Sequence, residues 1–220
     1  MRTRGRHLRC HRATGETTLF NAITGFTSTI EGHIRLFDTE LTDQSAAARA
    51  RSGLIRTFQI TNLMPGLTTV ENVMLGSLVV SGEHRSWWRP YSAASASVSR
   101  VEATLEMLGL SDVSHQRLDR LSYGDRRRVE LAMALAAEPR VLLLDEPAAG
   151  LSIAERDEML QVLVGLPEDL TIVMIEHDVE MIFAFADSVS VLNLGSLVTT
   201  GPAQEVREDE RVREVYLGSQ

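Results

Sequence analysis

Apolar residues recur at two different spacings along this chain. In the first two thirds they are mostly three or four positions apart, which is the period of an amphipathic helix. The helices predicted on this basis cover 17–26, 70–80, 100–110 and 125–137. Two shorter apolar stretches, at 33–38 and 53–59, look like strands separated by a polar segment. The middle of the chain is therefore predicted to be helical.

After Pro139 the pattern changes to short, fully apolar runs separated by helical segments. The predicted strands are 141–145, 171–177 and 188–195, and the helices between them lie near 153–164 and 178–186. Continuous apolar runs of this length are typical of parallel strands buried on both faces. Their alternation with helices predicts an α/β fold with a mostly parallel sheet.

The composition is that of an ordinary globular protein. The chain has 220 residues, of which 44% are hydrophobic and 24% charged. A formal net charge of −8 argues against a nucleic-acid partner held by a broad basic face. The only cysteine, Cys10, excludes an intrachain disulfide, and no apolar run approaches the roughly 18 residues of a membrane-spanning helix. We therefore expect a cytosolic protein with no nucleic-acid partner.

The segment GETTLF matches the second half of a phosphate-binding loop. The full pattern is G-x-x-x-x-G-K-[ST], leading from a strand into a helix. The residues that fit its end are Gly15, Thr17 and Thr18. Glu16, however, stands where the pattern has lysine, and Cys10 stands where it has the first glycine. The sequence thus predicts a degenerate phosphate site in front of a helix.

Residues 1–13 form an atypical N-terminal segment. They lack the apolar alternation of a strand that leads into a phosphate loop, so we expect no such strand there. One spelling of the codons for Arg9–Ala13, read one base later, encodes Gly-Ala-Ile-Gly-Pro, which suits a phosphate loop. A shifted or wrongly started reading frame and a chance match under codon degeneracy are both open.

Two adjacent carboxylates follow the apolar strand VLLLD. Asp145 and Glu146 are predicted at its carboxyl end, where open α/β sheets bind their ligands. The first carboxylate can hold Mg²⁺, and the second can orient and deprotonate an attacking water, as phosphoryl transfer requires. The alternative is a surface Asp-Glu pair that caps the following helix.

The stretch LSYGDRRRVELAMALAAEPRVLLLDEPAAGL at 121–151 resembles the signature segment, Walker B strand and D-loop of ATP-binding cassette (ABC) ATPases. In place of the common LSGGQ it keeps Ser122 and Gly124 and differs at two positions. By the same resemblance, Gln59 in RTFQ matches the glutamine that senses Mg²⁺ and water, and His177 in IEHD matches the histidine that contacts the γ-phosphate.

The resemblance covers about residues 14–218 and implies the fold. We expect a P-loop NTPase, RecA-like α/β core at 14–220, with an inserted helical subdomain at about 60–137. The antiparallel β part that precedes the phosphate loop in relatives, including an aromatic that stacks on adenine, is expected to be incomplete, because residues 1–13 do not supply it.

The resemblance also implies the function. RTFQ, IEHDVEMIF and the terminal TGPAQEVREDERVREVYLG look like ATPases of branched-chain or hydrophobic amino-acid uptake systems. The chain is then the ATP-hydrolysing subunit of an importer at the cytoplasmic membrane face. Its partners are a second cassette subunit, identical or not and arranged head to tail, the transmembrane permease subunits and, indirectly, a solute-binding protein.

Each matched residue receives a role by this resemblance. Glu146 is the catalytic base, His177 the γ-phosphate contact and Gln59 a further catalytic residue. The Mg²⁺ environment consists of Thr17, Gln59 and Asp145. The residues assigned to ATP itself are Gly15, Glu16, Thr17, Thr18 and, toward the opposite subunit, Ser122 and Gly124.

Glu16 puts the strength of ATP binding in question. A unit charge pair about 4 Å apart interacts by about 4 kcal/mol at an effective dielectric of about 20, and replacing attraction by repulsion doubles the difference. If relaxation, Mg²⁺ and salt remove about three quarters of it, on the order of 2 kcal/mol or thirtyfold in affinity remains. The alternative function is therefore a degenerate subunit with a binding or structural role, or a non-functional truncated gene product.

Overall fold

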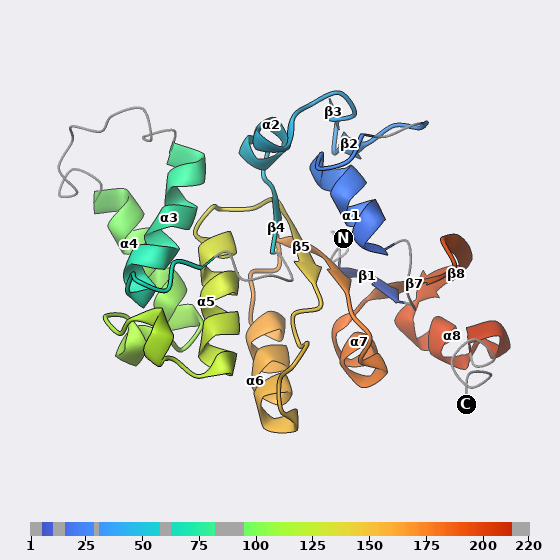
Figure 1. Ribbon diagram of the computed structural model, residues 1–220. Helices are drawn as coiled ribbons and strands as arrows, with labels where there is room; N and C mark the ends of the chain where they lie inside the picture. The colour runs from blue at the N-terminus through green and yellow to red at the C-terminus, as the bar shows by residue number, and fades with distance from the viewer. Residues whose placement is uncertain (1–5, 11–15, 29–30, 58–62, 82–94, 213–220) are drawn as a thin grey trace.

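The computed structural model describes residues 6–10, 16–28, 31–57, 63–81 and 95–212 (Figure 1). These residues form a six-stranded sheet in the order β4-β5-β6-β1-β7-β8, in which only β8 is antiparallel to its neighbour. Its strands are β1 (Arg6–Cys10), β4 (Leu54–Arg56), β5 (Val141–Asp145), β6 (Thr171–Ile175), β7 (Ser188–Asn193) and β8 (Ser196–Pro202). The predicted α/β class with a mostly parallel sheet is confirmed.

Helices follow most of the strands. They are α1 (Glu16–Thr24), α2 (Ala46–Arg51), α3 (Thr69–Ser81), α4 (Ser95–Met107), α5 (Tyr123–Leu135), α6 (Ile153–Val164), α7 (Val179–Phe185) and α8 (Ala203–Glu208). The predicted helices are confirmed, with shifted ends: α1 ends at Thr24 instead of 26, α4 covers Ser95–Met107 instead of 100–110, and α5 covers Tyr123–Leu135 instead of 125–137. Gly109 has φ 65°, a left-handed conformation that ends helices and that glycine adopts at low cost.

The first strand corrects the expectation that residues 1–13 contain no strand before the phosphate loop. Arg6–Cys10 forms β1, which lies between β6 and β7 near the centre of the sheet. Leu8 is in register with Met174 on one side and with Val189 on the other. Two parallel neighbours supply hydrogen-bonding partners along both edges of β1, a long-range effect that local apolar alternation does not report. The strand leads toward α1 as a phosphate-loop strand does.

A second correction concerns residues 33–38, which were predicted as one strand. They contain β2 (Arg35–Leu36) and a turn at Phe37, whose φ is 51°, and the chain then returns as β3 (Thr39–Glu40). This antiparallel hairpin is a small sheet of its own beside the main one. It follows α1 in the chain, so it is not the antiparallel part that was expected before the phosphate loop.

Both faces of the main sheet are covered, and β5 shows how. Leu142 and Leu144 belong to the larger hydrophobic core, whereas Val141 and Leu143 pack with Phe20 of α1 in a smaller core on the other face. Every residue of β5 is therefore buried. This explains its uninterrupted apolar sequence, because neighbouring residues of a strand point to opposite faces.

The helices α3, α4 and α5 pack against one another at one end of the molecule, and Figure 1 shows them beyond the β4 edge of the sheet. The crossing of α3 and α5 is close, since a Cβ atom on Gly76 would lie 1.9 Å from the Met133 carbonyl oxygen. Only glycine allows this approach. These three helices lie in the part of the chain that was predicted as a helical subdomain. The bounds of that subdomain, 60–137, stay a prediction.

Candidate functional site

The loops that follow β5 and β6 meet at one edge of the sheet. The two strands are parallel neighbours, and Asp145 is in register with Ile175. The amide of Glu146 donates to the Ile175 carbonyl at 2.8 Å, which extends the pairing by one residue. The side chains of Asp145, Glu146 and His177 are thereby delivered to the carboxyl end of the sheet, where α/β folds bind ligands.

Glu146 and His177 form a hydrogen-bonded pair. The His177 Nε2 lies 2.7 Å from the Glu146 Oε1, and 49% of the His177 side chain is exposed against 19% of Glu146. The backbone of Glu146 has φ 48°, which is uncommon for a residue other than glycine and persists only where the surroundings hold it. A carboxylate of this kind can take a proton from a water, with an imidazole beside it to contact an anionic ligand.

Asp145 is buried and forms an ion pair that the sequence did not reveal. Its Oδ2 accepts from the Arg56 Nη2 at 2.6 Å, and only 3% of Asp145 and 5% of Arg56 side chain is exposed. Arg56, the last residue of β4, also donates from Nη1 to the Asn21 Oδ1 at 2.7 Å. Its guanidinium carbon lies 5.3 Å from the centroid of the Phe20 ring. Arg56 thus joins β4, β5 and α1.

This donor set fits Mg²⁺ in one particular way. Mg²⁺ in proteins is usually held by one or two carboxylates, with waters and substrate phosphates as the other ligands. Asp145 offers one carboxylate at the sheet edge, and its Oδ2 is shared with Arg56. In the described ranges no group of three or more His, Cys, Asp or Glu residues could hold a metal by themselves. The described residues therefore suit a magnesium ion that arrives with a phosphate ligand.

Glu176 is a second buried residue that sequence reasoning missed. It lies between β6 and His177 with 4% exposure. Its Oε1 accepts from the Ala148 amide at 2.9 Å, and its Oε2 accepts from the His177 amide at 2.7 Å. The available signal was an acidic residue directly after the apolar run IVMI, where a buried position requires hydrogen-bond partners.

Ser122 and Gly124 lie in a second group, at the start of α5. Ser122 is the N-cap: its Oγ accepts from the Asp125 amide at 3.0 Å and lies 2.7 Å from the Asp125 Oδ2. A Cβ on Gly124 would lie 2.8 Å from the Glu155 Oε1, so this glycine permits close packing against α6. Within a single subunit, Gly124 therefore makes its close approach to α6.

Tyr123 connects the start of α5 to the loop after β5. Its hydroxyl donates to the Ala149 carbonyl at 3.1 Å. Gly150, with φ 77°, brings its backbone against the same ring, and a Cβ there would lie 3.1 Å from the Tyr123 hydroxyl oxygen. The two groups of candidate residues are thus joined through 146–150 within one chain.

The remaining candidate residues belong to the phosphate loop and to the segment after β4. Glu16 and Thr17 begin α1, and Thr18 follows them with an exposed side chain. Gly15 and Gln59 lie outside the described residues. The roles assigned to these five residues stay predictions.

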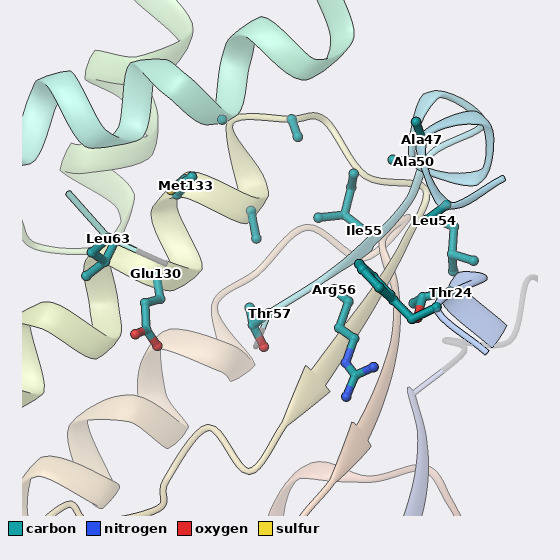
Figure 2. A pocket seen from close by; sticks show the side chains of 15 residues that line it. Thr24, Ala47, Ala50, Leu54, Ile55, Arg56, Thr57, Leu63, Glu130 and Met133 are labelled. Atoms are coloured by element: carbon teal, nitrogen blue, oxygen red, sulfur yellow. The ribbon is translucent and has the colours of Figure 1, made fainter. Parts of the chain in front are cut away.

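A cavity of about 360 Å³ lies between the sheet core and the helices α3 and α5 (Figure 2). Its lining is mostly apolar and includes Ala50, Leu54, Ile55, Leu63, Met133 and Ala134. Arg56 and Glu130 also line it, and Figure 2 shows Thr57 between them. The Glu130 Oε2 pairs with the Arg127 Nη1 at 3.0 Å, while within the described ranges its buried Oε1 has no hydrogen-bond partner. Burial raises the pKa of Glu130.

No helix in the described part of the chain is both long and apolar enough to cross a membrane.

Comparisons with known proteins agree with this geometry. A family model described as "ABC transporter" matches residues 11–149, and one described as "Branched-chain amino acid ATP-binding cassette transporter" matches residues 196–220. The chain is 33% identical over 211 residues to the high-affinity branched-chain amino acid transport ATP-binding protein LivG of Escherichia coli (strain K12), covering 93% of this chain and 83% of LivG.

Solved structures show the same likeness. MJ1267, an ATP-binding cassette of an ABC transporter in its ADP conformation, superposes with a TM-score of 0.82 and 25% identity, covering 98% of this chain and 88% of MJ1267. CbiO1 of Clostridium perfringens, part of the ABC transporter complex cbiONQ, superposes with a TM-score of 0.77 and 25% identity over 97% of this chain and 84% of that one.

Proposed function

The chain belongs to the ABC transporter ATPase family, whose members couple ATP hydrolysis to transport, and from this premise we propose that it powers an importer of branched-chain or other hydrophobic amino acids. The likeness to LivG and the family match at 196–220 support the transported class. The observation that carries ATP hydrolysis is the pair of Glu146 and His177, joined at 2.7 Å beside the buried Asp145. ATP is the nucleotide of this family.

The proposed reaction uses these side chains in separate roles. Glu146 takes a proton from the attacking water while the water oxygen bonds to the γ-phosphorus. The bond from that phosphorus to the oxygen shared with the β-phosphate breaks, and ADP leaves with the electron pair. His177 contacts the γ-phosphate and orients it toward the water. Because phosphoryl transfer depends mostly on positioning and charge, fixed side chains at this edge supply what the reaction needs.

The magnesium environment is proposed to comprise Asp145, Thr17 and Gln59. When bound, Mg²⁺ neutralises charge that develops on the β- and γ-phosphates. Arg56 balances the charge of the buried Asp145 carboxylate and holds this carboxylate at the sheet edge. Gly15, Glu16 and Thr18 belong to the proposed phosphate loop, whose second half enters α1.

We propose that the second cassette subunit, identical or not, completes the site head to tail. Ser122 and Gly124 then face the γ-phosphate held by the partner subunit, with the positive end of the α5 dipole toward the anion. In this arrangement, one subunit offers each of the two groups to a different nucleotide.

The proposed membrane partner is a permease. CbiO1 is part of a transporter complex, and the apolar cavity beside Arg56 is suited to a segment of a transmembrane subunit. The buried Glu130 Oε1 suits a hydrogen-bond donor on that segment, since a buried carboxyl oxygen without a partner is costly. We propose that the chain acts at the cytoplasmic membrane face, with a solute-binding protein as an indirect partner.

A second candidate function is favoured by Glu16. The chain contains no lysine at any position, so no lysine of its own can stand in at the phosphates. A subunit that binds ATP weakly can still supply Ser122 and Gly124 to a competent partner. In that case this chain acts as a binding partner and the other subunit hydrolyses ATP.

The experiment that tests the first function is Mg²⁺-dependent ATP turnover by the purified full chain. His177→Ala is compared with His115→Ala, a matched change at an exposed histidine in the helical segment. We expect a low rate in the wild type, a loss of about a hundredfold in His177→Ala and no change in His115→Ala. Equal rates in all three proteins would contradict the assignment.

A further inference from the structure

Glu176 contacts both loops that carry the proposed catalytic side chains. We propose that it is a positioning residue that fixes Glu146 and His177 relative to each other. The inference rests on the proposed function of those two side chains. In the proposed role, Glu176 contacts neither the nucleotide nor the attacking water, and it acts by holding the backbone of these two loops.

The contacts of Glu176 divide between its two carboxylate oxygens. Oε1 accepts from the amide of Ala148, in the loop after β5. Oε2 accepts from the amide of His177 at 2.7 Å and from that of Asp178 at 3.4 Å, in the loop after β6. With 96% of the residue buried, these bonds are shielded from competing water. One side chain therefore clamps two loops.

Each loop has a second anchor that makes the clamp effective. The Ala149 carbonyl, next to Ala148, accepts from the Tyr123 hydroxyl of α5. The Asp178 side chain caps α7 and pairs with Arg156 of α6. Held from both sides, the loops keep Glu146 in its left-handed conformation and His177 at hydrogen-bond distance from it.

The chemistry requires a carboxylate at position 176. A glutamine of the same size has one acceptor oxygen and one donor NH₂ group, so it can accept toward one loop only. Toward the other loop, its NH₂ group would face a backbone N–H, which is also a donor. Glu176→Gln therefore preserves volume and packing while it releases one of the two loops.

The test is amide hydrogen exchange of the full-length chain, resolved by residue. Glu176→Gln is compared with the wild type and with Glu180→Gln, a matched change at an exposed position on α7. We expect exchange at the Ala148 or the His177 amide to become about tenfold faster in Glu176→Gln, with β7 within about twofold of the wild type. The NMR signals of the His177 ring should also shift, although this ring is not a partner of the Glu176 carboxylate.

Two results would overturn the proposal. One is unchanged exchange at both amides together with unchanged His177 ring signals. The other is equal acceleration of all amides, β7 included, which indicates a purely structural role through global stability. Exchange measurements need no ATP, so they decide the role of Glu176 even where ATP turnover is absent.

ATP turnover provides the second readout. We expect the turnover number of Glu176→Gln to fall about tenfold while KM for ATP stays unchanged, since the clamp holds catalytic side chains and not the nucleotide. A rise in KM with an unchanged turnover number would contradict the positioning role. If neither the wild type nor any variant hydrolyses ATP, the proposed function fails. The exchange result then still decides whether Glu176 holds the two loops.

Discussion

The carboxyl ends of β6 and β1 lie side by side in the sheet, and the segments that follow them differ sharply. The loops after β5 and β6 carry Asp145, Glu146 and His177, with hydrogen bonds that hold each one. The segment after β1 leads into α1, where Glu16 stands in place of the lysine expected beside phosphates. The first region carries hydrogen-bonded acidic and histidine side chains, and the second carries an acidic residue where the phosphate-loop pattern has lysine.

This difference shows that the position of a strand and the chemistry of the loop after it have different requirements. The strand β5 reads VLLLD, whereas β1 reads RHLRC, yet both are parallel strands of the same sheet. Backbone pairing with two neighbours positions β1 whatever its side chains contribute. Phosphate binding is less tolerant, because a charge reversed beside the phosphates changes attraction into repulsion. A strand can therefore keep its position in the sheet while the residues that follow it depart from the expected pattern.

The largest expected effect comes from breaking the link between the two regions. Arg56 ties Asp145 of the intact edge to Asn21 of α1. Arg56→Met leaves the buried Asp145 carboxylate without its ion-pair partner, and we expect a loss of about 3 to 5 kcal/mol in the free energy of unfolding. Urea denaturation measures this loss.

The control for Arg56 is a double-mutant cycle with Asp145→Asn. Because the asparagine removes the charge that Arg56 compensates, the double variant should lose clearly less stability than the sum of the two single variants. Strictly additive losses would show that the ion pair is not the source of the effect.

The second-largest expected effect comes from placing lysine at position 16, at the start of α1. Glu16→Lys replaces repulsion by attraction at the phosphates, and we expect ATP affinity to rise by about 2 kcal/mol, or thirtyfold. Equilibrium binding of ATP to the full chain measures it. Glu102→Lys makes the same charge change at an exposed site on α4 and should leave the affinity unchanged. An equal rise in ATP affinity in both variants would show that the effect comes from the net charge of the protein and not from position 16.

The smallest expected effect lies in the intact region, at the cap of α6. Ser152 and Glu155 form a capping box, and Ser152→Ala should cost about 1 kcal/mol in the free energy of unfolding at neutral pH. The hydrogen bond from the Ser152 side chain holds the pKa of Glu155 below its ordinary value of 4.5.

This cap also predicts a pH dependence. A carboxyl whose pKa is lowered in the folded state stabilises the protein above its unfolded pKa, and this contribution is lost as the pH falls. The cost of Ser152→Ala should therefore shrink below about pH 4.5. Denaturation of both proteins at pH 7 and pH 3 measures the difference, and a constant cost would contradict the role of the carboxylate.

The sequence predicted the elements of the intact region because local pattern and position agree there. The run VLLLD is apolar since β5 is buried on both faces, and Asp145 ends it where the strand reaches the sheet edge. Ser122, Ser152 and Asp178 each precede a helix as its N-cap, which is a local signal too. Local signals of this kind can be read without knowledge of the fold.

The partners of the buried charges could not be predicted in the same way. Arg56 meets Asp145 across 89 positions of sequence, and Glu176 meets the Ala148 amide across 28. Which groups meet depends on strand order, and the order β4-β5-β6-β1 follows from long-range pairing. The strand β1 was missed for the same reason, because its own residues carry little apolar pattern.

The most direct test of the central claim is the single-turnover rate of ATP hydrolysis by the Glu16→Lys protein, with and without Glu146→Gln. Lysine at position 16 should bring ATP to the edge that carries Glu146 and His177. We predict measurable hydrolysis in Glu16→Lys and a loss of about a hundredfold or more when Glu146→Gln is added, at unchanged ATP affinity. Equal rates with and without Glu146→Gln would contradict the claim that this edge of the sheet performs the chemistry.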